Sequence, residues 1–114
     1  MKRYIYITTE FEGVHKYVDA PDEVSFLRHY HRHLFKVKLF ISVNHNDRDL
    51  EFILVKREIN TFIKETFYEN NNLSCESIAE QILRFAKYKY GAQRHIVCEV
   101  NEDGENGAVL ESEE

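Results

Sequence analysis

The sequence predicts an α+β domain, in which a four-stranded antiparallel sheet carries two helices on one face. Three observations lead to this fold class. β-Branched and alternating segments predict two strands before residue 44 and two after residue 94, and the region between them has the apolar periodicity of two helices. The 114 residues are 43% hydrophobic, which is enough for one core. We expect a single domain over residues 1–110 and an acidic tail over residues 111–114.

The first part of the chain predicts two strands that pair as a hairpin. The segment Arg3–Phe11 is rich in Tyr, Ile and Thr and predicts the first strand. A loop over Val14–Asp22 contains the only proline. In the second strand, His29–Val43, alternate residues share a face that begins with three histidines and continues with apolar side chains. The other face carries both charged and apolar side chains, so we expect it to be partly buried.

Two helices are predicted after a polar turn. The first spans about Leu54–Tyr68 and the second about Cys75–Tyr88. Ser74 is placed to cap the start of the second helix, and Gly91 follows its end, where a glycine is expected. The apolar stripes of the two helices consist of Val55, Ile59, Phe62, Ile63 and Phe67, and of Ile78, Ala79, Ile82, Leu83 and either Phe85 or Ala86.

Two more strands complete the order strand, strand, helix, helix, strand, strand. The third is predicted over His95–Glu102 and a short fourth over Ala108–Leu110, with a turn between them. This order is typical of an antiparallel sheet with both helices on one face.

Charge and composition exclude several classes of function. The formal net charge of −5 argues against non-specific nucleic-acid binding, which depends on neutralising phosphates. No apolar stretch approaches the length of a membrane span, and we expect no signal peptide. The two cysteines, Cys75 and Cys98, are too few for a disulfide framework and are typical of small buried residues. We therefore expect a cytoplasmic protein that binds neither nucleic acid nor a membrane.

The histidines of the second strand are the first candidates for chemistry. His29, His31 and His33 share one face, and two imidazoles spaced in this way can meet one metal ion. A third ligand has to come from another segment, and His15 lies just past the predicted first strand. Three neutral imidazoles with an open fourth position are typical of catalytic zinc, which polarises a carbonyl or activates a water. A solvated run of histidines is the alternative, and spacing alone leaves His29 as a ligand or a supporting residue.

Four segments, in this order, resemble motifs of the 6-pyruvoyl-tetrahydropterin and 6-carboxy-tetrahydropterin synthases. Phe11–His15 is similar to the first-strand motif of that family, and His31–Val37 resembles its His-Gly-His motif. Leu73–Ala79 resembles the Pro-Thr-Ser-Glu-Asn-Leu-Ala segment that starts the family's second helix. Val100–Glu102 resembles the late strand whose glutamate anchors the ligand. Together these segments extend over nearly the whole chain.

The resemblance implies a fold, a metal and a ligand. The fold is the tunnelling fold (T-fold), whose subunits assemble into a barrel, so a homo-oligomer is expected. The Glu102 carboxylate is implied to accept N–H donors from a pterin- or purine-like ring, since a carboxylate accepts two parallel hydrogen bonds. Asp103 and Glu99 remain alternatives for this anchor. A zinc ion is implied on three histidines: His15, His31 and His33.

The chain also departs from the family pattern. The family's catalytic cysteine is missing from the window Val24–Arg28, where Ser25 is a weak substitute because a serine hydroxyl needs a base. The family's Asp-His pair between the helices is missing as well. His29 is the other weak candidate for a catalytic group. Arg32 replaces the family glycine, and it either holds a phosphate or carboxylate of a ligand or points to the opposite face.

These features predict a zinc-binding, synthase-like protein that binds a pterin-, purine- or nucleotide-like small molecule. Its synthase activity is expected to be very slow or absent, since general acid–base groups typically contribute ~10²–10⁴-fold in rate. One alternative is an active lyase in which Ser25, His29 or a neighbouring subunit supplies the missing groups. A second is a non-catalytic protein that sequesters its ligand in an intersubunit pocket. The third is an oligomer in which zinc only stabilises the fold.

Overall fold

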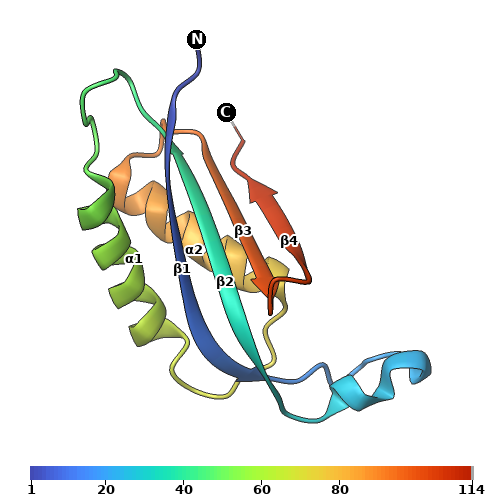
Figure 1. Cartoon of the computed structure of the whole chain (residues 1–114). Coiled ribbons are helices and arrows are strands. Elements are labelled where there is room, and N and C mark those ends of the chain that lie inside the picture. Colours follow the sequence, from blue (N-terminus) through green and yellow to red (C-terminus); the bar gives the residue numbers. More distant parts are fainter. Residues whose placement is uncertain (114) are drawn as a thin grey trace.

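Four strands form one open antiparallel sheet, and two α-helices cover one of its faces (Figure 1). The computed structural model describes residues 1–113. The elements in chain order are β1 (Tyr4–His15), the 3-10 helix η1 (Asp22–Arg28), β2 (His31–Ser42), α1 (Phe52–Thr66), α2 (Cys75–Tyr90), β3 (Ile96–Glu102) and β4 (Asn106–Glu111). The strand order is β1-β2-β3-β4, so β1 and β4 are the edges. The predicted α+β class and the four-stranded antiparallel sheet are confirmed.

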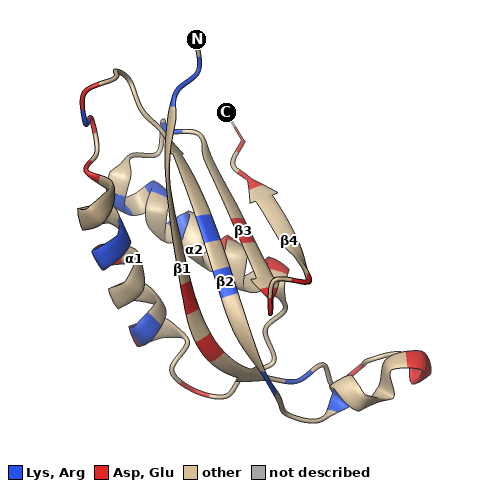
Figure 2. Cartoon of the chain, viewed as in Figure 1, with Lys and Arg blue, Asp and Glu red and all other residues tan. Residues whose placement is uncertain are grey.

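The two faces of the central strand β2 differ as the alternation predicts. Phe35, Val37, Leu39 and Ile41 are buried, because the face that they share lies against the helices. The opposite face carries charged residues, and Glu10 of β1 lies directly across from Lys36. Figure 2 shows acidic positions of β1 beside basic positions of β2 on this uncovered face.

The helices turn their apolar stripes toward the sheet. In α1 the buried residues are Val55, Ile59 and Ile63, and in α2 they are Cys75, Ile78, Ala79, Ile82, Leu83 and Ala86. The Ser74 side chain accepts a hydrogen bond from the Ser77 backbone N–H, as predicted for an N-cap. Gly91 follows α2 with a φ of 128°, a conformation that side-chain-bearing residues rarely adopt. Neither α1 nor α2, nor any other helix within residues 1–113, has the length and apolarity needed to cross a membrane.

Several predicted boundaries were wrong. The first strand does not end at Phe11 but continues to His15, because its pairing with β2 runs without interruption to the pair His15–His31. The second strand starts at His31, since η1 and its C-cap His29 precede it. The first helix lies two residues earlier than predicted, where the Glu51 side chain accepts a hydrogen bond from the Ile53 N–H and caps its start.

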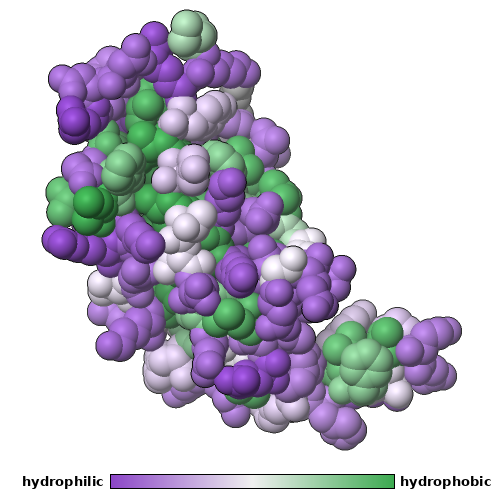
Figure 3. All heavy atoms as spheres, in the orientation of Figure 1, coloured by the Kyte–Doolittle hydropathy of each residue, from purple (hydrophilic) through white to green (hydrophobic). Residues whose placement is uncertain are grey.

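The connection between β1 and β2, residues 16–30, projects from the body and is called the arm below (Figure 1). It contains η1, which has no buried residues, and Ala20 is the only buried residue of the arm. Large apolar or aromatic side chains of the arm are more than half exposed. These are Tyr17, Val18, Phe26 and Tyr30. Figure 3 shows a hydrophobic patch on this projecting segment.

Candidate metal centre and its cavity

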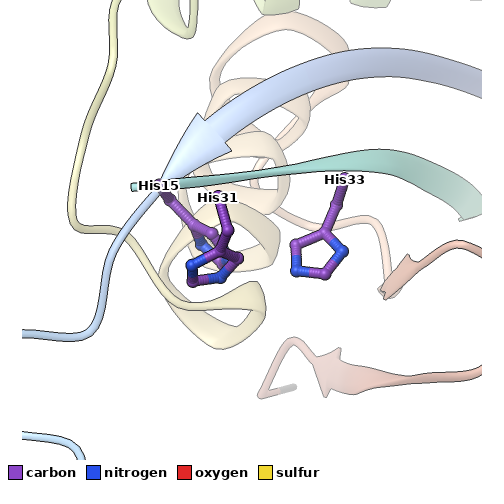
Figure 4. Close-up of side chains that lie close together, drawn as sticks. All are labelled: His15, His31 and His33. Atoms are coloured by element: carbon purple, nitrogen blue, oxygen red, sulfur yellow. The ribbon is translucent and has the colours of Figure 1, made fainter. Parts of the chain in front are cut away.

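Three histidines converge where β1 ends and β2 begins (Figure 4). His15 and His31 are directly opposite in the strand pairing, and His33 is two residues further along the same face. The ring centroids lie 4.5 Å apart for His15 and His31, 4.9 Å for His31 and His33, and 5.3 Å for His15 and His33. One nitrogen atom from each ring lies within 4.8 Å of the others. The cluster predicted from the sequence is therefore present, and it can hold a metal ion.

Hydrogen bonds fix which nitrogen of each ring faces the centre. His15 Nδ1 lies 2.7 Å from the Leu73 carbonyl oxygen, and His31 Nδ1 lies 2.8 Å from the carbonyl oxygen of His29. His33 Nδ1 lies 2.7 Å from Asp103 Oδ2. Carbonyl and carboxylate oxygens only accept hydrogen bonds, so each Nδ1 carries the proton. In the neutral rings each Nε2 then carries a lone pair, which is the form that binds a metal.

The burial of these nitrogens supports a cation at the centre. His15 is only 7% exposed. Within residues 1–113, His15 Nε2 and His33 Nε2 are buried and have no hydrogen-bond partner. A buried polar atom without a partner is destabilising, and such an atom calls for an explanation such as a bound ion. Imidazole is a good ligand for zinc and for several other transition metals, so the donor set fits a metal without specifying zinc.

Asp103 supports the cluster from the turn after β3. Its Oδ2 accepts the His33 N–H, and its Oδ1 accepts the Leu34 backbone N–H at 2.9 Å. The hydrogen bond from His33 is the main reason that the pKa of Asp103 is lowered, and the one from Leu34 adds to it. Asp103 has a φ of 59°, in the left-handed region that aspartate tolerates better than most residues. The residue therefore acts as an orienting carboxylate behind His33.

Aromatic packing forms the inner wall of the cluster. The Phe35 ring lies edge-on to the rings of His15 and His33, with centroid separations of 5.2 and 5.8 Å. Gly13, opposite His33 in the pairing, makes room for this ring. A Cβ atom at Gly13 would lie 2.8 Å from Phe35 Cε2, which is closer than real contacts allow. A side chain larger than hydrogen at this position would therefore force the Phe35 ring to shift.

The loop between the two helices completes the support of His15. Asn71 forms a short parallel bridge with the end of β1, in which Lys16 N–H donates to the Asn71 carbonyl and Asn71 N–H to the Val14 carbonyl. The Asn71 side chain also accepts from the Leu73 N–H at 2.8 Å. These contacts hold the Leu73 carbonyl where it accepts the hydrogen bond from His15 Nδ1–H. Sequence reasoning missed both residues.

A cavity of about 580 Å³ opens beside the histidines. This volume is in the range of small-molecule sites. His15, His31 and Glu102 line it on the sheet side, and Leu27 of the arm and Cys75 at the start of α2 line it elsewhere. The Cys75 thiol has a pKa raised to about 12 by burial and, to a lesser degree, by the charges of Glu102 and Glu76, so it remains protonated.

Glu102 is the carboxylate that faces the Nε2 atoms of His15 and His33. It ends β3, and its Oε2 lies 3.1 Å from His15 Nε2 and 3.7 Å from His33 Nε2. Its side chain is 28% exposed and borders the cavity. Of the two alternative anchors, Asp103 is occupied by His33, and Glu99 pairs with Lys38 in the strand register and neighbours Asn101 Nδ2 at 3.4 Å.

The other predicted site residues lie outside this cluster. Ser25 is exposed on η1 and does not line the cavity. His29 is exposed, and its backbone carbonyl rather than its ring contributes to the site. Arg32 belongs to the uncovered face of the sheet, where it forms an exposed ion pair with Glu12 at 2.9 Å. The structure therefore brings Glu102 to the three histidines but not Ser25, His29 or Arg32.

No protein-family model matches the chain, and no curated protein matches it.

Proposed function

We propose that this chain is a zinc-dependent small-molecule-binding protein related to the 6-pyruvoyl- and 6-carboxy-tetrahydropterin synthases, with a T-fold and little or no synthase activity. The single observation that carries the proposal is the convergence of one ring nitrogen from each of three histidines at the edge of a ligand-sized cavity. The motif resemblance, in family order along the chain, supports the choice of family.

Zinc is the proposed metal because the donor set is three neutral imidazoles. In catalytic zinc sites three protein ligands leave one position for water or a ligand. When bound, zinc would polarise an oxygen of the ligand and so strengthen its attachment. The chain's own contribution is orientation: Leu73, His29 and Asp103 each hold one ring by its Nδ1.

The proposed ligand is a pterin- or purine-like ring, or a nucleotide that contains one. Such rings present adjacent N–H donors, and the Glu102 carboxylate at the cavity border is the proposed acceptor. The cavity volume of about 580 Å³ is sufficient for a molecule of this size.

Binding without turnover is favoured by the chemistry that the chain lacks. The protonated Cys75 thiol is a poor nucleophile, because the thiolate is the reactive form. Ser25 is exposed, does not line the cavity, and makes no hydrogen bond to a base among the described side chains. An active lyase, the second candidate, would therefore need a catalytic group from another subunit.

The proposed assembly is a homo-oligomeric barrel with cavities between subunits. The outer sides of the edge strands β1 and β4 pair with no other strand in the part of the chain described, apart from the single bridge between His15 and Asn71, and such free edges are sites for strand addition. The exposed apolar patch of the arm borders the cavity through Tyr17, so a neighbouring subunit could cover both.

Metal content and ligand turnover test the proposal together. Wild-type protein purified without chelator should contain one zinc per chain by elemental analysis, and His31→Ala should lose it. His45→Ala is the matched control, because His45 lies in the exposed turn after β2 and does not belong to the cluster. A wild-type protein without zinc, or His31→Ala with full zinc, would show that the proposal is wrong.

The zinc-loaded protein is then incubated with dihydroneopterin triphosphate. Binding by calorimetry without product formation is the expected result. Product formation would establish the lyase instead. Zinc without binding of any pterin or purine would favour a structural role for the metal.

A further inference from the structure

The Glu102 carboxylate lies close to two ring nitrogens of the histidine cluster. Its Oε2 faces His15 Nε2 at 3.1 Å and His33 Nε2 at 3.7 Å, and neither of these buried nitrogens has a hydrogen-bond partner within residues 1–113. In the neutral rings both Nε2 atoms carry lone pairs, because the proton of each ring lies on Nδ1. A carboxylate oxygen and two imidazole lone pairs therefore point at one region, and these groups repel unless a cation lies between them.

The distances match the edges of a zinc coordination sphere. Zinc–nitrogen and zinc–oxygen bonds of about 2.0–2.2 Å in a tetrahedron place neighbouring ligand atoms about 3.3–3.6 Å apart. The two measured separations, 3.1 and 3.7 Å, lie on either side of this value. A carboxylate held only by a nearby proton would form a hydrogen bond, but His15 Nε2 has no such bond.

We infer that Glu102 is a displaceable fourth ligand, which closes the open position of a metal held by His15, His31 and His33 while the cavity is empty. The inference rests on the metal site of the proposed function, and it describes how the metal is coordinated when no small molecule occupies the cavity. The side chain is 28% exposed and borders the cavity, so it can swing away when a ligand enters. A ligand that donates hydrogen bonds to Glu102 would then also free the fourth coordination position of the metal.

Variants at Glu102 separate reach from charge. Glu102→Gln removes the charge and keeps the length, whereas Glu102→Asp keeps the charge but shortens the side chain by one methylene group. The matched control is Glu99→Gln, which removes the same charge from the same strand but on the opposite face of the sheet. Circular dichroism of each variant shows whether it folds.

The measurement uses Co²⁺ as a spectroscopic probe of the site, with imidazole as a neutral competing ligand. Both Glu102 variants should bind Co²⁺ at least tenfold more weakly than wild type and change its visible absorption. Once loaded, they should bind added imidazole at least tenfold more tightly, since no carboxylate has to be displaced. Glu99→Gln should resemble wild type in all three readouts.

The possible failures are distinguishable. If wild type does not bind Co²⁺, or if His31→Ala binds it equally well, the metal site itself is wrong and the proposed function falls with it. If wild type binds one Co²⁺ through the histidines, but both Glu102 variants retain its affinity, spectrum and imidazole affinity, only the inference about Glu102 is overturned. A loss of affinity in Glu102→Gln and Glu99→Gln alike would show an effect of net charge and would also overturn it.

Discussion

Asp103 provides a sharp test of how the metal centre is oriented, because its two oxygens have separate partners. Oδ2 accepts from His33 Nδ1 at 2.7 Å, and Oδ1 accepts from the Leu34 backbone N–H at 2.9 Å. Asparagine has a single side-chain oxygen, so Asp103→Asn can satisfy only one of these donors. Asparagine also tolerates the left-handed φ of 59°, so the backbone of the turn is preserved.

The expected effect is on metal affinity rather than on folding. Loss of the partner behind a metal-bound histidine typically costs 10–100-fold in affinity, which is about 1.4–2.7 kcal/mol. The zinc Kd of Asp103→Asn should therefore rise by about 10–100-fold, because the His33 ring loses both its orientation and its basicity. The far-ultraviolet circular dichroism of the metal-free protein should not change.

Competition with a chromophoric zinc chelator measures this Kd. The control is Asp47→Asn, which removes the same charge from an exposed turn where Asp47 forms an ion pair with its neighbour Arg48. A Kd within about twofold of wild type for Asp103→Asn would refute the reasoning, since the carboxylate would then have no part in holding His33. Equal losses of zinc affinity in the two variants would show that the effect comes from net charge alone.

Three further predictions concern packing, the uncovered face and pH. Gly13→Ala places a Cβ atom 2.8 Å from Phe35 Cε2 and should cost about 1–3 kcal/mol in urea unfolding; an unchanged midpoint would mean that the ring moves freely. Arg32→Ala breaks an exposed ion pair with Glu12 on the uncovered face, so zinc binding by calorimetry should be unchanged, and a tenfold loss of zinc affinity would place Arg32 in the site. Burial raises the Cys98 pKa to about 12 from an ordinary value of 9.0. The folded state then keeps a proton that the unfolded state loses, so the free energy of unfolding should fall as pH rises from about 9 toward 12, and it should fall less in Cys98→Ala. Denaturant unfolding at pH 8 and pH 10 measures this change. An equal loss of unfolding free energy in wild type and Cys98→Ala would contradict the prediction.

Periodicity was sufficient to predict the sheet and the helices. The buried face of β2 and the stripe Val55, Ile59 and Ile63 follow from residue alternation and helical spacing, which depend on local geometry. The helix η1 was missed because it is short, has no buried residue, and is interrupted by non-helical dihedral angles at Val24. The end of β1 was misplaced because strand length depends on the partner strand.

The candidate site was predictable only where side chains carry the signal. Spacing and motif order indicated His15, His31 and His33, and the structure brings these residues together. The carbonyl of Leu73 was not predictable, because any residue has a carbonyl and its position depends on the loop between the helices. The role of Asp103 was not predictable either, since it arises from a left-handed turn that aims its carboxylate back at β2.

The arm is attached to the body at the two strand ends that carry His15 and His31. A metal ion held by these residues would join the two ends of the arm, much as a disulfide closes a loop. For a loop of about 15 residues, such a cross-link restricts the unfolded chain by an amount worth about 3 kcal/mol in the chain-entropy description. Removal of the metal would therefore loosen the base of the arm first, and amide hydrogen exchange should increase there before it increases in the sheet.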